Sequence, residues 1–139
     1  MKILLVDDDK AFAKITKKFL QAFKFQIVEA HTGQEALNAY KNDTFDLIIT
    51  DMVMPQMDGA QLITEIRLID RANPIIVISA YEDKLKNLDV FAALSKPIEY
   101  KQLFNKVDEV KNFLEHKPII QKKIQSLTSV LTNFLVVCA

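Results

Sequence analysis

Short, unbroken apolar runs, each closed by a polar or turn residue, restrict the fold of this chain more than any other feature. The runs are ILLV from residue 3, QIVEA from residue 26, FDLIIT from residue 45, PIIVIS from residue 74 and the weaker FAALS from residue 91. Continuous runs of this length, without strict alternation, are typical of parallel strands that are buried on both faces. The sequence therefore predicts five strands of a largely parallel sheet.

Stretches with helical spacing separate these runs. Apolar residues recur there at steps of three and four: Phe12, Ile15, Phe19 and Phe23, then Leu62, Ile63, Ile66 and Ile69, then Leu103, Val107, Val110 and Leu114. The alternation of strands and helices predicts five β-α repeats in a doubly wound α/β sheet with right-handed crossovers. Residues 81–90 leave room for only a short fourth helix.

Length and charge restrict the class of protein. A chain of 139 residues is long enough for one domain with a core and too short for two ordinary ones. The 18 basic and 18 acidic residues balance, so no bulk charge favours nucleic acid as a partner. Cys138 has no second cysteine to pair with, and the first apolar run ends too early, at Asp7, to be an export signal or a membrane span. We therefore expect a cytoplasmic protein that contacts neither nucleic acid nor membrane directly.

The last segment of the chain, residues 118–139, carries a separate pattern. Pro118 is a favourable first residue for a helix. The apolar residues that follow at alternating steps of four and three are Ile120, Ile124, Leu127, Leu131, Phe134 and Cys138. This seam of about two and a half heptads leaves two interpretations open: a homodimer contact through the helix, or a helix that packs on its own domain or leads into a linker. We expect one domain over residues 1–117 and a helical extension or linker over residues 118–139.

Polar residues follow four of the five predicted strands. They are Asp7, Asp8 and Asp9 after the first strand, Asp51 after the third, Ser79 after the fourth and Lys96 after the fifth. Because the carboxyl ends of parallel strands share one edge of a sheet, these residues are expected to meet there. Carboxylates about 5 Å apart repel by roughly 3 kcal/mol at an effective dielectric near 20. Mg²⁺, which prefers a few carboxylates and water, is the natural ion to offset that repulsion.

Each of these residues also has a purely structural interpretation. Aspartate at a helix start caps free N–H groups and suits the positive end of the helix dipole. A serine after a strand is often a turn residue, and a lysine before proline is often plain surface. Independent structural needs would rarely place an acid, an acid, a hydroxyl and an amine, in that order, at four strand ends. The combination of these residues therefore favours a functional site.

The motifs LLVDDD, DMVMPQMDG, VISA and SKPI occur in the order found in one family. Over residues 1 to about 117, the sequence resembles the response regulator receiver domain (CheY-like) of bacterial two-component signalling. The resemblance implies a flavodoxin-like fold with strand order 2-1-3-4-5. It also implies a cytoplasmic signalling role with a histidine kinase or phosphotransfer protein as phosphodonor and a downstream protein as target.

The resemblance assigns a role to each residue of the site. Asp51 would take the phosphoryl group and form an aspartyl phosphate. Asp8, Asp51 and the backbone carbonyl of Val53 would bind Mg²⁺, and Asp7 would act through water. Lys96 and Ser79 would contact the phosphoryl oxygens. Such a protein is not an enzyme in the usual sense, since it catalyses only its own phosphorylation and dephosphorylation. The Lys96-Pro97 bond is expected to be cis, as is common in the family.

The loop after Asp51 has a predictable role. Pro55 and Asp58-Gly59 are expected to fix the turn that leads into the third helix. Met52, Met54 and Met57 are expected to pack rather than to bind metal. His31 is expected to be a loop residue near the start of the second helix and not a phosphate carrier.

The chain departs from the family pattern in two places. Family members usually carry an aromatic switch residue three positions before the site lysine, where this chain has Ala93. Phe91, two residues earlier, is a candidate substitute. The stretch from Ser79 to Lys96 is also shorter than usual, which puts in doubt the signalling face that includes the fourth helix.

Two other functions remain open from the sequence. A haloacid dehalogenase-like phosphatase would use Asp7 as its nucleophile, but Ala11 stands where threonine or valine is expected and the DMVMPQMDG loop would have no task. A degenerate receiver would act as an interaction module without phosphorylation. Ala93 and the short fourth helix favour that alternative, and the intact set of acids, serine and lysine argues against it.

Overall fold

The computed structural model describes residues 1–138. Its elements in chain order are β1 (Lys2–Val6), α1 (Lys10–Ala22), β2 (Gln26–Ala30), α2 (Gly33–Asn42), β3 (Leu47–Asp51), α3 (Gly59–Ile69), β4 (Ile75–Ser79), the 3₁₀ helix η1 (Glu82–Leu85), β5 (Ala92–Ser95) and α4 (Tyr100–Cys138). The strands form one parallel sheet in the order β2-β1-β3-β4-β5. Both the predicted doubly wound fold and the strand order are confirmed.

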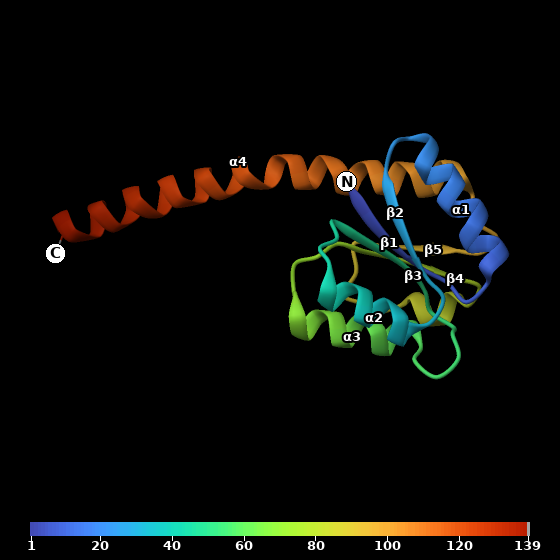
Figure 1. The fold of residues 1–139 in the computed structure, drawn as a ribbon. Helices are drawn as coiled ribbons and strands as arrows, with labels where there is room; N and C mark the ends of the chain where they lie inside the picture. The colour runs from blue at the N-terminus through green and yellow to red at the C-terminus, as the bar shows by residue number, and fades with distance from the viewer. Residues whose placement is uncertain (139) are drawn as a thin grey trace. The chain divides into compact units, whose positions relative to one another are not determined.

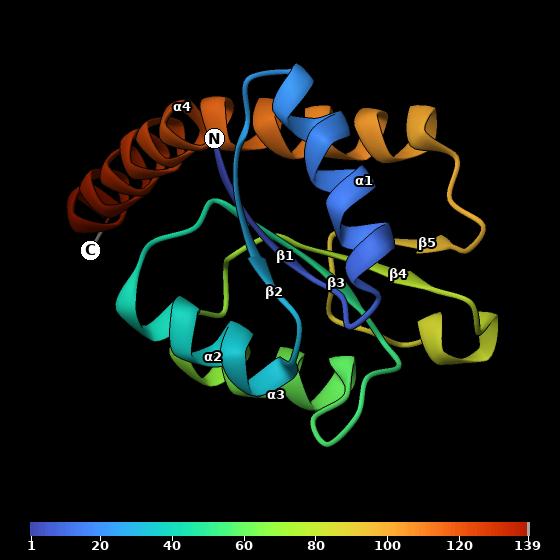
Figure 2. The same ribbon diagram turned by 45° about the vertical axis from the view of Figure 1, so that its right-hand side comes forward.

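The sheet is covered by helices on both faces, with α2 and α3 on one face and α1 with the first turns of α4 on the other (Figures 1 and 2). Every residue of β3 and β4 is buried, as the continuous apolar runs predicted. The side chains on the α2 and α3 face form one core cluster that includes Ile48, Val77, Leu62 and Ile66. The residues at the carboxyl ends of these strands are thereby held on a rigid base.

Polar side chains fix where the helices begin. Asp9 caps α1 by accepting hydrogen bonds from the Ala11 and Phe12 amides, and Thr32 caps α2. Asp58 caps α3 and forms a capping box with Gln61. In the three loops that lead from β1, β2 and β3 into α1, α2 and α3, a capping side chain thus closes the turn next to the polar edge of the sheet.

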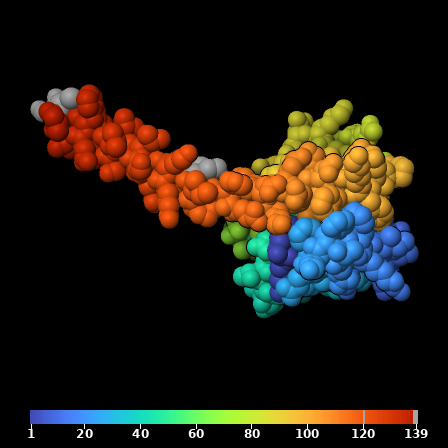
Figure 3. Space-filling view, turned by 90° about the horizontal axis from the view of Figure 1, so that it is seen from above, coloured from blue at the N-terminus to red at the C-terminus, as the bar shows by residue number. Residues whose placement is uncertain are grey.

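The packing of α1 agrees only partly with its apolar spacing. Phe19 lies against Tyr100 with ring centroids 4.8 Å apart, and Phe23 lies 4.4 Å from Phe104. Figure 3 shows α1 in blue beside the first turns of α4 in orange. Ile15 belongs to the same spacing but is 58% exposed. The apolar stripe of α1 is wider than the surface that covers it.

The fourth helix of the repeat is reduced to a single turn, as the short segment predicted. Four residues, Glu82–Leu85, form η1 between β4 and β5. Ala93 pairs with Val77 in the sheet and therefore faces the α2 and α3 side. Its side chain is exposed, whereas Val77 is buried. The edge strand β5 consequently lacks the cover that a full helix would give it.

The predicted C-terminal helix is present, but the expectation that it begins at Pro118 was wrong. Pro118 lies inside α4, which runs without a break from Tyr100 to Cys138. Proline in a helix removes one backbone hydrogen bond at a cost of about 3 kcal/mol, which the rest of a 39-residue helix tolerates. The sequence has glycine only at positions 33 and 59, so none ends the helix near residue 118.

The described residues divide into two units, Met1–Val107 and a second that begins at Asp108. None of the helices in residues 1–138 is both long and apolar enough to cross a membrane.

Candidate phosphoacceptor site

Four strand ends bring their polar residues together, as the sequence predicted. Lys96 follows β5, and its Nζ lies 2.9 Å from Oδ2 of Asp7 and 3.1 Å from Oδ2 of Asp51. Ser79, at the end of β4, is fully buried, and its carbonyl accepts a hydrogen bond from the Lys96 amide at 2.8 Å. The lysine ammonium therefore sits between two carboxylates that come from different strands.

Three carboxylates gather at this edge. Asp7, Asp8 and Asp51 each offer a carboxylate oxygen within 4.8 Å of the others. Asp7 is 1% and Asp51 8% exposed, whereas Asp8 is open to solvent. Asp9, the fourth acid of the sequence pattern, is not part of this group because its side chain caps α1. The structural interpretation of the triple aspartate thus holds for Asp9 and not for the other two.

Backbone amides fix the orientation of Asp51. Its Oδ1 accepts hydrogen bonds from the Met52 amide at 2.7 Å and the Val53 amide at 3.3 Å, so Oδ2 is the oxygen that meets Lys96. The Ser79 hydroxyl accepts a hydrogen bond from the Tyr81 amide at 3.1 Å. The hydroxyl proton of Ser79 is thereby left to be donated elsewhere.

Burial and charge shift two pKa values in the site. Burial raises the pKa of the Asp7 carboxyl, although a hydrogen bond from Lys96 and another from the Asp9 amide partly offset that effect. Burial by itself would lower the pKa of Lys96, but its bonds and attraction to Asp7 and Asp51 outweigh burial and raise it. Three acids face one lysine, so negative charge is in excess. A hard cation with oxygen ligands fits this donor set.

The loop from Met52 to Asp58 is held tightly against the site. A Cβ at Gly59 would lie 2.3 Å from the Asp51 carbonyl oxygen and 2.7 Å from Cα of Met52. Gln56 adopts a positive φ of 67°, which helps to turn the loop. Met52 and Met54 are buried in the core, and Met57 packs against it. The prediction that the methionines pack is confirmed.

Sequence reasoning missed two contacts of the site. The Lys96 ammonium lies 4.5 Å from the centroid of the Phe12 ring, a cation–π contact that helps to hold the lysine. His31 is a loop residue before α2, as predicted, but its Nδ1 also lies 3.1 Å from the Asp7 carbonyl oxygen. Nothing in the spacing of the sequence points to either contact, because each joins segments that are far apart in the chain: Lys96 with Phe12 of α1, and His31 with Asp7. The predicted cis bond at Lys96-Pro97 is present.

The family comparison agrees with this geometry. The model of the response regulator receiver domain matches residues 3–108. The chain belongs to the response regulator receiver domain family. This receiver is similar to the transcriptional regulatory protein GlrR of Escherichia coli K12, with 31% identity over 112 residues, which cover 77% of this chain and 25% of GlrR. The receiver thus spans about a quarter of that relative.

Solved structures of receivers have the same fold. The response regulator TrrA from Thermotoga maritima, in complex with Mg²⁺-BeF, matches with a TM-score of 0.74 and 29% identity over 78% of this chain and 97% of TrrA. A CheY-like receiver from Methanospirillum hungatei matches with a TM-score of 0.78 and 27% identity over 84% of this chain and 97% of its own. Receivers bind Mg²⁺ at their acidic pocket, and Asp7, Asp8 and Asp51 form such a pocket here.

Proposed function

We propose that this receiver accepts a phosphoryl group on Asp51 and signals through altered contacts with a downstream protein. The phosphodonor would be a histidine kinase or a phosphotransfer protein, and the reaction would depend on Mg²⁺. One observation carries the proposal: Oδ2 of Asp51 lies 3.1 Å from Lys96 Nζ, on an edge that also holds Asp7 and Asp8. The cytoplasm is the proposed compartment, because Cys138 has no disulfide partner in the sequence.

Each residue has a proposed part in the transfer. An oxygen of the Asp51 carboxylate forms a bond to phosphorus as the phosphorus–nitrogen bond of the donor phosphohistidine breaks, and the imidazole keeps that electron pair. Lys96 would then shift its ammonium toward the phosphoryl oxygens, and Ser79 would donate its hydroxyl proton to one of them. These parts are supported by burial and by the shared sheet edge.

Mg²⁺, when bound, would neutralise charge on the phosphoryl oxygens. Asp8, Asp51 and the Val53 carbonyl are its proposed ligands, with Asp7 acting through water. The chain would perform no chemistry on other molecules beyond its own phosphorylation and dephosphorylation.

The first test is intact-mass spectrometry with site mapping after incubation with Mg²⁺ and acetyl phosphate. A single phosphoryl adduct on Asp51 is expected, absent with EDTA and absent in Asp51→Asn. An adduct on Asp7 would instead favour the phosphatase. The absence of any adduct would favour a phosphorylation-independent interaction module.

The extended helix is the proposed dimer contact. We place the receiver within residues 1–117 and assign residues 118–139 to self-association. Ile124, Leu127, Leu131 and Phe134 recur at steps of three and four, and each is more than half exposed. Sedimentation velocity should show a concentration-dependent dimer that Leu127→Lys with Leu131→Lys abolishes. Thr128→Lys with Thr132→Lys, which adds the same charge outside the a and d positions of the seam, is the control. A chain that stays monomeric at high concentration would contradict the dimer.

A further inference from the structure

A groove lies beside α3, at the place on the sheet where the reduced fourth helix leaves β5 uncovered. Its volume is about 530 Å³. One wall is a stripe of α3 at steps of three and four, from Ala60 through Ile63, Thr64, Arg67 and Leu68 to Arg71 just beyond the helix. The other wall is the segment Asn87 to Asp89 before β5. The groove therefore follows α3 for roughly 12 Å, the rise of the eight helical steps from Ala60 to Leu68.

The groove combines apolar surface with a cationic side chain at its end. Leu68 is 78% exposed, and Leu88 on the opposite wall is half-buried. Ile63 lies deeper, and Arg71 is exposed. The lining includes two arginines and one aspartate, so positive charge prevails. A ligand that matches it needs an apolar face and an acidic group.

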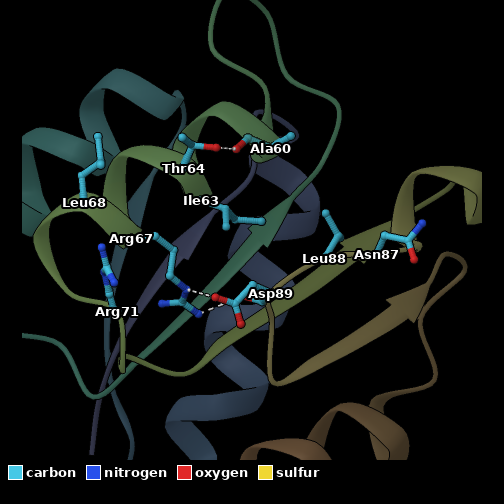
Figure 4. Close-up of a pocket in the computed structure, with 9 residues that line it drawn as sticks. All are labelled: Ala60, Ile63, Thr64, Arg67, Leu68, Arg71, Asn87, Leu88 and Asp89. Carbon is cyan, nitrogen blue, oxygen red and sulfur yellow. Dashed lines mark hydrogen bonds and ion pairs between the residues drawn. The ribbon is translucent and has the colours of Figure 1, made fainter.

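Arg67 holds the two walls together. Its guanidinium donates to the carbonyl oxygens of Asn73 at 2.9 Å and Asp89 at 3.0 Å, and its Nε lies 3.3 Å from the Asp89 carboxylate. Figure 4 shows this side chain reaching from α3 to Asp89, with Ile63 and Leu88 nearby. The Arg67 side chain is 16% exposed, so it acts as a clamp rather than as a free binding group. The groove is thereby preformed, which lowers the entropic cost of binding.

The layer of helices on this face of the sheet shows what kind of partner fits. Helices α2 and α3 lie side by side there (Figure 2), and the next place in that layer has only the four residues of η1. A helix laid along α3 would continue the layer at ordinary helix–helix spacing and would place residues at steps of three and four into the groove.

We propose that this groove binds an amphipathic helix of a partner protein, with an apolar face toward Leu68 and Leu88 and an acidic side chain toward Arg71. The tail of a second copy fits less well, because residues 118–139 contain Lys122 and Lys123 and no acidic residue. The proposal goes beyond phosphorylation of Asp51, since the groove residues are separate from the phosphoacceptor site.

The test uses the full chain and three labelled 16-residue helical peptides. One has leucines at steps of four and three with glutamates beside them, the second has lysines in place of the glutamates, and the third is a scrambled form of the first. Fluorescence anisotropy should show the glutamate peptide binding at least about tenfold more tightly than either of the others. Amide chemical shifts should change along α3 and at residues 87–89.

Three single variants sharpen this test. Leu68→Ser should weaken binding about tenfold, Arg71→Glu should reverse the preference toward the lysine peptide, and Ile15→Ser, at an exposed apolar position on α1, should change nothing. Equal binding of all three peptides, no binding at millimolar concentration, or shift changes confined to other elements would overturn the proposal. So would a Leu68→Ser variant that loses self-association and keeps peptide binding, because a second copy would then be the occupant.

Discussion

The stretch from Ser79 to Lys96 contributes both to the polar edge of the sheet and to the connection between β4 and β5. The two regions differ sharply in how much of the family pattern they keep. Ser79 and Lys96, at the two ends of that stretch, are buried or paired within the phosphoacceptor site. Between β4 and β5 the chain forms only η1, and Ala93 in β5 is left exposed. The chemistry of a receiver thus needs fixed strand ends, whereas the surface between them can be remodelled.

The largest expected effect is the loss of phosphorylation when the lysine of the polar edge is removed. Lys96→Ala leaves Asp7 and Asp51 without their cation, so we expect the rate of phosphorylation by acetyl phosphate to fall roughly 10²-fold or more. Lys96→Arg should rescue it poorly, because the planar guanidinium does not replace a compact ammonium between two carboxylates. Lys84→Ala, in η1, is the matched control. The rate is measured by mass spectrometry over time. If both lysine variants lost the same share of the phosphorylation rate, the polar edge and the connection would not differ in their importance for the chemistry.

The second-largest effect is expected from a substitution at a glycine of the loop beside the polar edge, compared with a substitution in the connection between β4 and β5. Gly59→Ala places a methyl group 2.3 Å from the Asp51 carbonyl oxygen, so the loop must shift. We expect the free energy of unfolding to fall by about 3 kcal/mol, with slower phosphorylation. Asn87→Gly, in the connection, relieves a positive φ of 57° and should change stability by less than about 1 kcal/mol. Urea unfolding of both variants measures the difference, and similar values for the two would contradict it.

The clamp of the groove gives a third, smaller effect. Arg67→Ala removes hydrogen bonds to three carbonyl groups, of Asp70, Asn73 and Asp89. We expect a loss of about 2 kcal/mol in unfolding free energy while phosphorylation of Asp51 is retained. Thermal unfolding and the mass of the phosphorylated product report the two quantities. A variant that keeps its stability but loses phosphorylation would show that the connection takes part in the chemistry.

The smallest effect concerns the buried carboxylate. Because burial raises the pKa of Asp7 above its ordinary value of 3.8, the folded state holds this proton more tightly than the unfolded chain. The contribution of Asp7 to stability therefore falls as pH rises from about 3.8 through the raised value. Without metal at pH 7, Asp7→Asn should therefore be more stable than the wild type.

Mg²⁺ should reverse that order. It should stabilise the wild type, by about 1.4 kcal/mol at ten times its dissociation constant, and should stabilise Asp7→Asn much less. Urea unfolding at pH 4 and pH 7, with and without Mg²⁺, measures both effects. A wild type that gains nothing from Mg²⁺ would argue against the proposed metal site.

Much of the fold and the site could be read from particular residues. The runs at residues 45–50 and 74–79 specify buried strands because each is apolar along nearly its whole length, and β3 and β4 are buried throughout. Asp7, Asp51, Ser79 and Lys96 could be placed on one edge because parallel strands end on the same side. The strand order came from the resemblance to the receiver family and not from spacing, since the apolar runs do not say which strands are neighbours.

Other features could not be read in this way. Asp8 and Asp9 are adjacent identical residues, and only the start of α1 decides that one faces the acidic pocket while the other caps the helix. Ile15 has the spacing of a core residue but is exposed, because burial depends on what packs against α1. Pro118 has the chemistry of a helix start and lies inside α4, because a long helix tolerates one missing hydrogen bond.

The strands, the order of elements and the acids, hydroxyl and amine at the sheet edge follow from the amino-acid sequence alone, because they depend on local patterns and on the direction of parallel strands. Three contacts depend instead on how the chain packs in three dimensions: Lys96 bridges Asp7 and Asp51, Gly59 lies too close to Asp51 for a side chain, and Arg67 joins α3 to Asp89. Those contacts join residues up to 89 positions apart in the chain, and such distances are fixed by packing rather than by sequence spacing.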